Sequence, residues 1–200
     1  MVKVYGDVRS GNCYKVKLML HLLGLDYQWV DIDVKAGQTR TEAFLALNPN
    51  GKIPVLELED GTCLWESNAI LNFLADTSAY LPREPRLRTQ VLQWQFFEQY
   101  SHEPYVAVAR FIKLYEGMPA DKAEQHAFCL SRGYRALRVM EQQLSRTPFL
   151  VGQDCSIADI ALFAYTHVAH EGGFDLSAYP AINVWIERIQ SLPKFVGIGE

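Results

Sequence analysis

The most specific string in the sequence is Asn48-Pro49-Asn50-Gly51-Lys52-Ile53-Pro54-Val55-Leu56. Its first half is rich in turn-forming residues. Its second half begins a strand at Pro54, where the missing N–H of proline does least damage to a ladder. A cis Ile53-Pro54 bond would turn the N–H and C=O of Ile53 sideways, toward whatever lies beside the strand. Only about 5–6% of X–Pro bonds are cis, so these residues alone leave the cis and trans forms open.

Upstream of this stretch, strand and helix patterns alternate. Residues Val2 to Tyr5 predict a short strand, and Ser10 is a suitable N-cap for a helix with apolar residues at helical spacing. Gly24 is expected to end that helix in the left-handed conformation. Apolar residues alternate with aspartates from Val30 to Val34, which predicts a second strand. A short helix is expected from Glu42 to Leu47.

Downstream, two strands and a helix complete the order αββα. The strands are expected at Val55–Leu58 and Thr62–Trp65, and Asp60-Gly61 between them is a strong hairpin signal. Ser67 is expected to cap the helix that follows. The earlier βαβ unit requires a parallel strand pair and the hairpin adds antiparallel strands, so the pattern predicts a mixed sheet.

Beyond this sheet the character of the sequence changes. Residues 77–86 contain two prolines among polar neighbours and are predicted to form a linker. From there the pattern is helical to the last residue, and four helix starts are indicated, near Arg86, Pro119, Ser156 and Pro180. We therefore expect an α/β domain at residues 1–76 and an all-α helical domain at residues 87–200.

Composition and charge exclude several classes of function. The 200 residues carry a net charge of −4 at pH 7, with a pI of about 5.7. No basic stripe of the kind that binds phosphates is present, so nucleic acid is not an expected partner. Charges interrupt every apolar stretch well before the roughly 20 residues that span a bilayer, so no membrane partner is expected. The sequence opens on strand-like residues without a basic leader, which predicts a cytoplasmic location.

The four cysteines are widely separated, at positions 13, 63, 129 and 155. They form no C-x-x-C pair, and no histidine stands at metal-ligand spacing from any of them. This pattern is typical of reduced thiols and disfavours zinc, so no metal is implied.

Three motifs give the chain a family resemblance. The string N-P-x-G-K-I-P-x-L at residues 48–56 is followed by Glu66-Ser67-x-Ala69-Ile70, and Ser156-Ile157-Ala158-Asp159 stands in the helical half. In this order and at this spacing they resemble the cytosolic glutathione S-transferase family, over nearly the whole chain. The resemblance implies a thioredoxin-like N-terminal domain, glutathione as co-substrate and a homodimer.

The resemblance also implies a glutathione site on the first domain. The backbone of Ile53, before a cis Pro54, would pair with the cysteinyl segment of glutathione like an added strand. Ser67 at a helix N-terminus would offer its hydroxyl and N–H to the γ-glutamyl carboxylate, and Glu66 would face the ligand's ammonium. Lys52 and, more weakly, Gln38 are candidates to reach the glycyl carboxylate. Each could equally be a solvated surface group.

The turn Ser10-Gly11-Asn12-Cys13 lies where thioredoxin-like oxidoreductases carry C-x-x-C. A hydroxyl at its first position removes the dithiol cycle. It resembles the serine-type, bacterial-like transferases, whose serine donates a hydrogen bond to the glutathione thiolate. Asn12 is a second candidate donor, in which case Ser10 is only a helix cap. Cys13 is expected inside the first turn of the helix, and a mixed disulfide with glutathione is the alternative.

Three features are expected in the helical half. Ser156 and Asp159 fit a capping box, which is a structural role. Many aromatic residues lie between Trp94 and Tyr115, and two of them, Tyr105 and Phe111, are candidates for the wall of a cleft that binds the second substrate. His102 is expected on the surface rather than as an acid–base catalyst.

The expected function is a glutathione S-transferase that activates glutathione as a thiolate for attack on a small apolar electrophile. Glutathione-dependent reduction of disulfides or peroxides would use the same thiolate, so the sequence does not separate these two reactions. A non-catalytic binding protein with a transferase-like fold is the third reading. The complete set of Ser10, Ile53, Glu66 and Ser67 argues against it, because a scaffold has no need of a ligand site.

Overall fold

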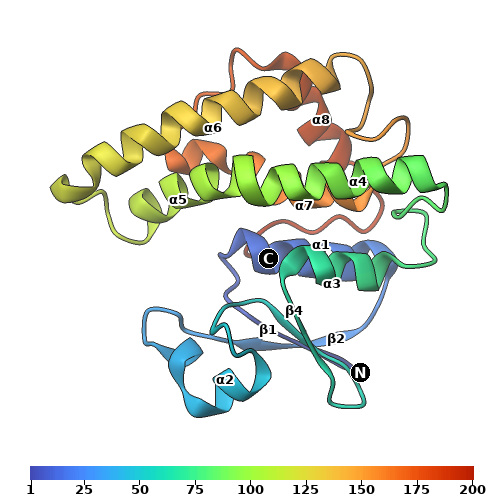
Figure 1. Ribbon diagram of the computed structural model, residues 1–200, viewed down its shortest axis with the longest axis vertical. Coiled ribbons are helices and arrows are strands. Elements are labelled where there is room, and N and C mark those ends of the chain that lie inside the picture. The colour runs from blue at the N-terminus through green and yellow to red at the C-terminus, as the bar shows by residue number, and fades with distance from the viewer. The chain divides into compact units, whose positions relative to one another are not determined.

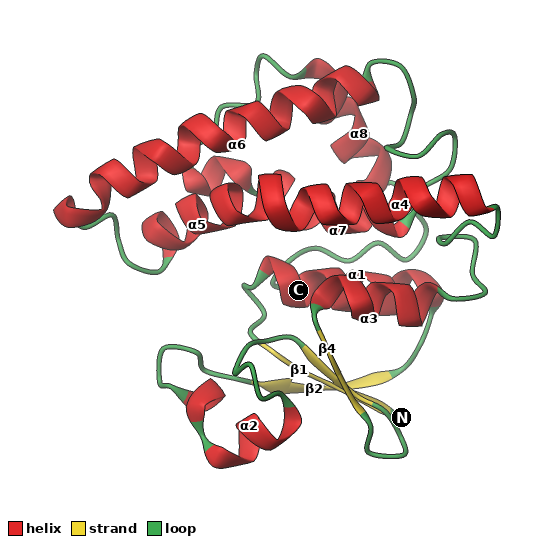
Figure 2. Ribbon diagram, in the orientation of Figure 1, coloured by secondary structure: helices red, strands yellow, loops and turns green.

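The computed structural model describes all residues from 1 to 200. The chain divides into two compact units. The first contains Met1–Ser78 together with Leu192–Glu200, and the second contains Ala79–Ser191. All four strands belong to the first unit, and the second consists of helices and their connections (Figure 2).

The first unit is built on a four-stranded mixed sheet. Its strands are β1 (Val2–Gly6), β2 (Tyr27–Asp31), β3 (Val55–Glu57) and β4 (Cys63–Trp65). Their order in the sheet is β2-β1-β3-β4. β1 pairs in parallel with β2, with Val4 opposite Trp29, and antiparallel with β3, with Val4 opposite Leu56. The thioredoxin-like fold expected from the sequence is therefore confirmed.

The helices of this unit are α1 (Gly11–Leu23), α2 (Glu42–Leu47) and α3 (Ser67–Ala75), with a 3₁₀ turn at Gln38–Arg40. α1 and α3 lie side by side along the sheet, and α2 lies apart from them (Figure 1). The sheet and these two helices share a core of fully buried residues, Val4, Val16, Leu20, Leu56 and Ile70. Burial of one such aliphatic side chain stabilises a fold by about 1.5–3 kcal/mol, so this core fixes both helix starts against the sheet.

The second strand lies earlier in the chain than the pattern of Val30 to Val34 predicted. β2 ends at Asp31, and Val34 is 41% exposed. The reason is a local turn, because the Asp33 carboxylate accepts a hydrogen bond from the N–H of Ala36 at 2.9 Å. Aspartate forms such turns readily, and here its turn chemistry outweighs the alternation of apolar residues.

The last nine residues belong to the first unit, although the sequence analysis assigned them to the helical domain. The Tyr14 hydroxyl on α1 donates to the carbonyl of Val196 at 2.7 Å. Lys17, also on α1, donates to the backbone oxygen of Glu200. The C-terminal tail is therefore bound to α1, and the chain passes from one unit to the other twice.

The second unit contains five main helices. They are α4 (Pro85–Phe97), α5 (Glu103–Leu114), α6 (Ala123–Leu144), α7 (Ile157–Thr166) and α8 (Pro180–Gln190). A π-helical turn, Glu98–His102, joins α4 to α5, and 3₁₀ turns occur at Ala120–Lys122 and Ala169–Gly172. α4 already begins at Pro85, inside the predicted linker, because the Glu84 carboxylate caps it. No helix is both long and apolar enough to cross a membrane.

The predicted capping box is confirmed at the start of α7, the helix whose residues are all buried. The Ser156 hydroxyl accepts a hydrogen bond from the N–H of Ala158, and the Asp159 carboxylate accepts one from the N–H of Ser156. Asp159 is fully buried and also accepts from the indole N–H of Trp185 and from the N–H of Leu150. The box therefore ties α7 to two other segments.

The prediction that His102 lies on the surface is wrong. Its side chain is fully buried, and its Nε2 lies 2.9 Å from the Thr166 hydroxyl of α7. The π-helical turn that ends at His102 holds more residues than an α-helical turn does. The extra residue of this turn changes the direction in which side chains point, and the sequence carries no signal of it.

Candidate active site

Ser10 occupies the N-cap position of α1, between β1 and the helix. Its backbone is extended, and its hydroxyl oxygen accepts a hydrogen bond from the N–H of Cys13 at 3.4 Å. The side chain is only half-buried. A serine hydroxyl has one proton and two lone pairs. Capping occupies a lone pair, so the same oxygen can donate its proton to an anion beside the helix.

Asn12 and Ser67 come together although 55 positions separate them in the sequence. The Ser67 hydroxyl donates to Asn12 Oδ1 at 3.3 Å. Ser67 is buried and is the first residue of α3, and Asn12 is half-buried in the first turn of α1. Two helix N-termini, each a favourable place for negative charge, therefore meet at one pair of polar side chains.

Glu66 takes the N-cap position of α3, which the sequence analysis gave to Ser67. Its φ of 68° lies in the left-handed region, and its side chain makes no capping bond. A non-glycine residue in this region costs of order 1–3 kcal/mol and persists where the surrounding structure enforces it. The exposed carboxylate of Glu66 therefore stands beside the free end of α3, next to the buried Ser67.

The Ile53-Pro54 peptide bond is cis, as the family resemblance implied. Asn48, which is buried, organises the turn that leads to it. Its amide donates to the carbonyl of Lys52 at 2.7 Å, and its Oδ1 accepts from the N–H of Asn50 at 2.9 Å. No role for Asn48 was predicted from the sequence. Its place before a proline in a turn-rich string was the available signal.

Lys52 and Gln38 were both candidates for binding a carboxylate, and the structure gives them different settings. The Lys52 side chain is exposed. Gln38 is also exposed, but its Oε1 accepts a hydrogen bond from the N–H of Asp33 at 2.7 Å. Gln38 therefore already has a structural role in its own loop.

Cys13 is fully buried in the first turn of α1. Burial raises the pKa of its thiol to about 12, against a smaller lowering effect of the hydrogen bond with Ser10. The sulfur lies so close to Gly6 that a Cβ on that residue would be only 2.8 Å away. The thiol is therefore protonated at neutral pH and enclosed, which is the setting of an inert core cysteine.

The two aromatic residues expected to line a second-substrate cleft, Tyr105 and Phe111, have different neighbours. Tyr105 on α5 meets Phe128 of α6 edge to face, with ring centroids 6.0 Å apart. Phe111 is 42% exposed and stacks on Tyr115 at 5.0 Å. Six positions apart on a helix, they point in directions about 120° apart. The structure therefore does not bring them together into one wall.

Comparison with known proteins agrees with this arrangement over both units. The family model for the glutathione S-transferase N-terminal domain matches residues 9–77, and the model for the C-terminal domain of the same family matches residues 102–196. The first match contains the cis-proline turn and the two helix starts described above.

Individual relatives are similar over most or all of their length. The crystal structure of a glutathione S-transferase from Pseudomonas fluorescens shares 72% identity, covers 100% of this chain and 99% of that chain, and has a TM-score of 0.99. The disulfide-bond oxidoreductase YfcG of Escherichia coli is 35% identical over 191 residues, which cover 91% of this chain and 87% of YfcG. A glutathione transferase from Phanerochaete chrysosporium, solved with oxidized glutathione, is 26% identical with a TM-score of 0.85, over 96% of this chain and 92% of that chain.

Proposed function

The chain belongs to the glutathione S-transferase family, and from this premise we propose that it binds glutathione at the starts of α1 and α3 and transfers its thiolate to a small apolar electrophile. The observation that carries this proposal is the half-buried Ser10 hydroxyl at the start of α1, two residues before Asn12, whose side chain is bonded to Ser67. A nucleophilic sulfur requires a donor that favours its anion, and this turn supplies one.

The turn that contains Ser10 can supply the free energy needed to lower the pKa of a bound thiol. Lowering a thiol pKa by about two units requires roughly 2.7 kcal/mol. One hydrogen bond to a charged group contributes about 1.5–3 kcal/mol, and a helix N-terminus adds about 0.3–1 kcal/mol. Ser10 at the N-cap of a 13-residue helix combines both effects. Asn12 remains the alternative donor, and the two are separated by experiment below.

We place the glutathione backbone against the cis Ile53-Pro54 turn. The backbone of Ile53 would hydrogen-bond the cysteinyl segment, the start of α3 at Ser67 would receive the γ-glutamyl carboxylate, and Glu66 would face the ammonium. The strained backbone of Glu66 supports this, because such strain is commonly found at ligand sites. Lys52, exposed beside the turn, is our candidate for the glycyl carboxylate, and Gln38 is the weaker one.

Variants of the γ-glutamyl subsite test this binding mode. Each of Glu66→Ala and Ser67→Ala removes a contact to the ligand head worth about 1–3 kcal/mol, so the glutathione KM should rise about tenfold or more in both. Far-ultraviolet circular dichroism should be unchanged, since neither side chain belongs to the apolar core. An unchanged KM in both variants would move the ligand head to another part of the protein.

For the second substrate we propose an apolar surface on α5 that includes Phe111. Its ring, stacked on Tyr115 and 42% exposed, can cover a flat apolar molecule at little conformational cost. Tyr105 is the weaker candidate, because its ring already packs against Phe128. A panel of aryl halides, organic peroxides and mixed disulfides, each assayed for glutathione consumption, identifies the preferred electrophile class.

A second candidate function is glutathione-dependent disulfide reduction, which the 35% identity to a disulfide-bond oxidoreductase favours. The balanced reaction joins two glutathione molecules into glutathione disulfide and releases the substrate as two thiols. The burial of Cys13 and its high pKa argue against a protein mixed disulfide on this route. Both thiolates would therefore come from glutathione. In the panel, turnover of mixed disulfides without turnover of aryl halides would select this function.

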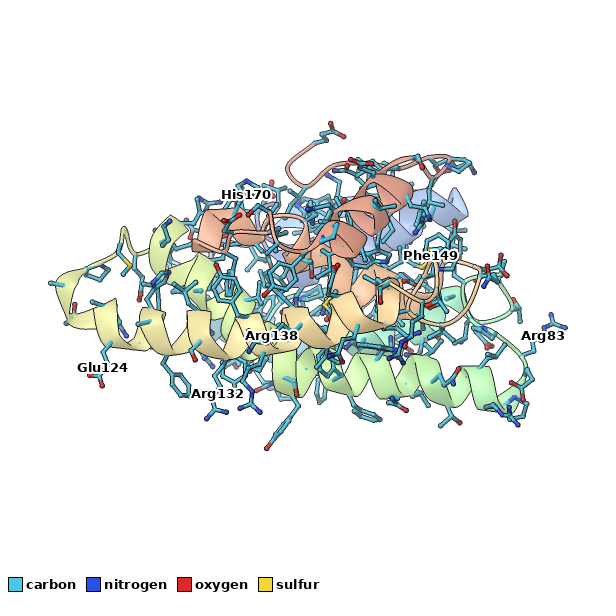
Figure 3. The ribbon with its side chains drawn as sticks, turned by 90° about the horizontal axis from the view of Figure 1, so that it is seen from above. Arg83, Glu124, Arg132, Arg138, Phe149 and His170 are labelled. Atoms are coloured by element: carbon cyan, nitrogen blue, oxygen red, sulfur yellow. The ribbon has the colours of Figure 1, made fainter.

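We further propose that the protein is a homodimer that uses the surface between α4 and α6. A groove of about 490 Å³ there is lined by Tyr100, Tyr105 and Arg132, among others. The side chain of Arg132 extends outward from α6 (Figure 3). Tyr100 is 84% exposed and Phe96 is 71% exposed, and exposed aromatic residues of this size are characteristic of interaction surfaces. Sedimentation should give a dimer for the natural chain and a monomer for the Phe96→Asp/Tyr100→Asp variant.

The four cysteines are free, and three of them are buried. Reduced thiols in a protein of this size are usual for a reducing compartment, and this supports our proposal of a cytoplasmic location.

A further inference from the structure

Lys15 is a charged residue in an unusual place. It lies on α1, one turn beyond Ser10, and its side chain is fully buried. Lysine is almost never fully buried unless its charge is paired. Its Nζ lies 3.3 Å from the hydroxyl oxygen of Ser67, the first residue of α3.

The direction of the hydrogen bonds around Ser67 follows from the groups involved. An ammonium can only donate, so Ser67 Oγ accepts from Lys15. The Asn12 carbonyl oxygen can only accept, so the Ser67 proton points toward Asn12 Oδ1, 3.3 Å away. A chain of three polar groups therefore runs from Lys15 through Ser67 to Asn12.

The positive charge also acts on the first turn of α1. Burial is the main influence on the Cys13 thiol and raises its pKa, but the charge of Lys15 acts in the opposite direction and lowers it. The field of the ammonium therefore extends to a sulfur atom in the turn that carries Ser10 and Asn12. A thiolate bound beside that turn would experience the same sign of charge.

Lys17, two residues further along α1, shows that burial of a lysine on this helix does not by itself imply such a role. Lys17 is 7% exposed, and its ammonium donates to the backbone oxygen of Glu200 in the C-terminal tail. This contact of Lys17 ties the tail to the helix, whereas Lys15 contacts the start of α3. The two lysines therefore form a matched pair, one structural and one at the candidate site.

We propose that Lys15 is a positioning residue that makes the site selective for the γ-glutamyl carboxylate, because its buried ammonium orients the Ser67 hydroxyl and adds positive charge where that carboxylate binds. This inference rests on the proposed function, in which the start of α3 receives the ligand's γ-glutamyl head. In this role Lys15 does not touch the ligand and acts through Ser67.

Two ligands and two matched variants test the inference. The ligands are glutathione and 4-aminobutyryl-cysteinylglycine, which differs from glutathione only in lacking the α-carboxylate. Calorimetry on Lys15→Met should show a glutathione Kd raised by about tenfold or more, with a much smaller change for the analogue. Lys17→Met should leave the ratio of the two affinities as it is in the natural protein. An equal loss for both ligands in Lys15→Met would make Lys15 a merely structural lysine and overturn the inference.

A double-mutant cycle with Ser67→Ala tests the route of the effect. If Lys15 acts through Ser67, the second substitution should cost little in affinity once the first is present, whereas full additivity would contradict the route. Lys15→Gln keeps a hydrogen-bond donor without the charge. If Lys15→Met does not fold, the same measurements are made on Lys15→Gln. Absence of glutathione binding by the natural protein would overturn the proposed function itself. Glutathione binding with unchanged selectivity in Lys15→Met or Lys15→Gln overturns only the role of Lys15.

Discussion

Two helices of this protein begin at a serine cap, and the two caps have opposite surroundings. Ser10 at the start of α1 is half-buried, and its oxygen makes one long capping bond to Cys13. Ser156 at the start of α7 is 2% exposed and is bonded to the fully buried Asp159. The carboxylate of Asp159 accepts four hydrogen bonds in all.

The difference shows how one local motif serves two purposes. At the start of α7 the side chains of Ser156 and Asp159 are buried and hydrogen-bonded, so this cap contributes stability and is closed to a ligand. At α1 the cap is weaker and partly open, so part of the hydrogen-bonding capacity of Ser10 remains available. A saturated cap is a structural element, and an open one at the same position of a helix is a candidate for chemistry.

The largest expected effect comes from breaking the saturated cap. Asp159→Ala would leave the N–H groups of Leu150, Ser156 and Trp185 buried without their acceptor, at about 1–3 kcal/mol each before relaxation. We expect a loss of about 3–5 kcal/mol in the free energy of unfolding and a thermal midpoint lower by roughly 10 °C. Differential scanning calorimetry measures both.

The matched control is Ser156→Ala, which removes only the hydroxyl and should cost about 1 kcal/mol. The folded fraction of both variants should keep a near-normal kcat for glutathione transfer. Normal stability together with lost activity in Asp159→Ala would contradict the purely structural role of this cap.

The opposite end of α7 extends the comparison to pH. Burial lowers the pKa of His167 from 6.5 to about 4, against the raising effect of its hydrogen bond to the Phe163 carbonyl. The unfolded chain therefore binds a proton between these two values that the folded chain does not. The corresponding stability is present above pH 6.5 and is lost as the pH falls toward 4, by up to roughly 3 kcal/mol.

His167→Phe isolates this contribution, because it keeps a ring to stack on Phe163 and removes the titrating group. Urea unfolding at several pH values from 7 to 4.5 should show a shallower loss of stability in the variant than in the natural protein. Parallel curves would mean that His167 has the same pKa in the folded and the unfolded chain.

The sequence predicted the architecture well because its signals are local. Gly24 ends α1 with a φ of 68°, and the capping box at Ser156 has its own sequence signature. The strand predicted from the alternation of Val30 to Val34 was misplaced because the turn at Asp33 competes with a strand. Propensity alone does not decide between the two. The surface position predicted for His102 was wrong because the sequence carries no signal of the π-helical turn that ends at this residue.

The site was only partly readable for a different physical reason. The cis form of Ile53-Pro54 followed from the family resemblance and not from the residues, since a cis bond leaves no mark on composition. The contact of Ser67 with Asn12 and the burial of Lys15 depend on how two helices pack, over separations of 55 and 52 positions. A periodic pattern shows which face is apolar, and it does not show which polar group meets which.

A smaller change in free energy is expected from substitution of Ser10, the partly open cap of α1. Ser10→Ala should raise the pKa of bound glutathione by about 1–2 units and lower transfer activity near neutral pH by about tenfold or more. Glutathione affinity should change little, because the hydroxyl acts on the anion. The ultraviolet absorbance of the bound thiolate, titrated with pH, measures the shift directly.

Asn12→Ala is the matched variant in the same turn. If its titration moves while that of Ser10→Ala does not, then Asn12 is the donor to the sulfur, and Ser10 is only a cap like Ser156. That result would remove the distinction between the two helix starts on which the comparison rests.

The smallest expected effect is on Cys13, the one sulfur in the open turn. Burial raises the pKa of its thiol to about 12, so the thiol is protonated at pH 7, and it has no exposed surface. Cys13→Ala should therefore leave both glutathione transfer and disulfide reduction unchanged, at a stability cost of about 1 kcal/mol for the lost packing against Gly6. Cys63→Ala, on the edge strand β4, is the matched control for loss of a thiol. Loss of disulfide reduction in Cys13→Ala alone, with transfer retained, would mean that α1 opens to expose this thiol during turnover. The chemistry of the turn would then belong to its cysteine as well as to its serine cap.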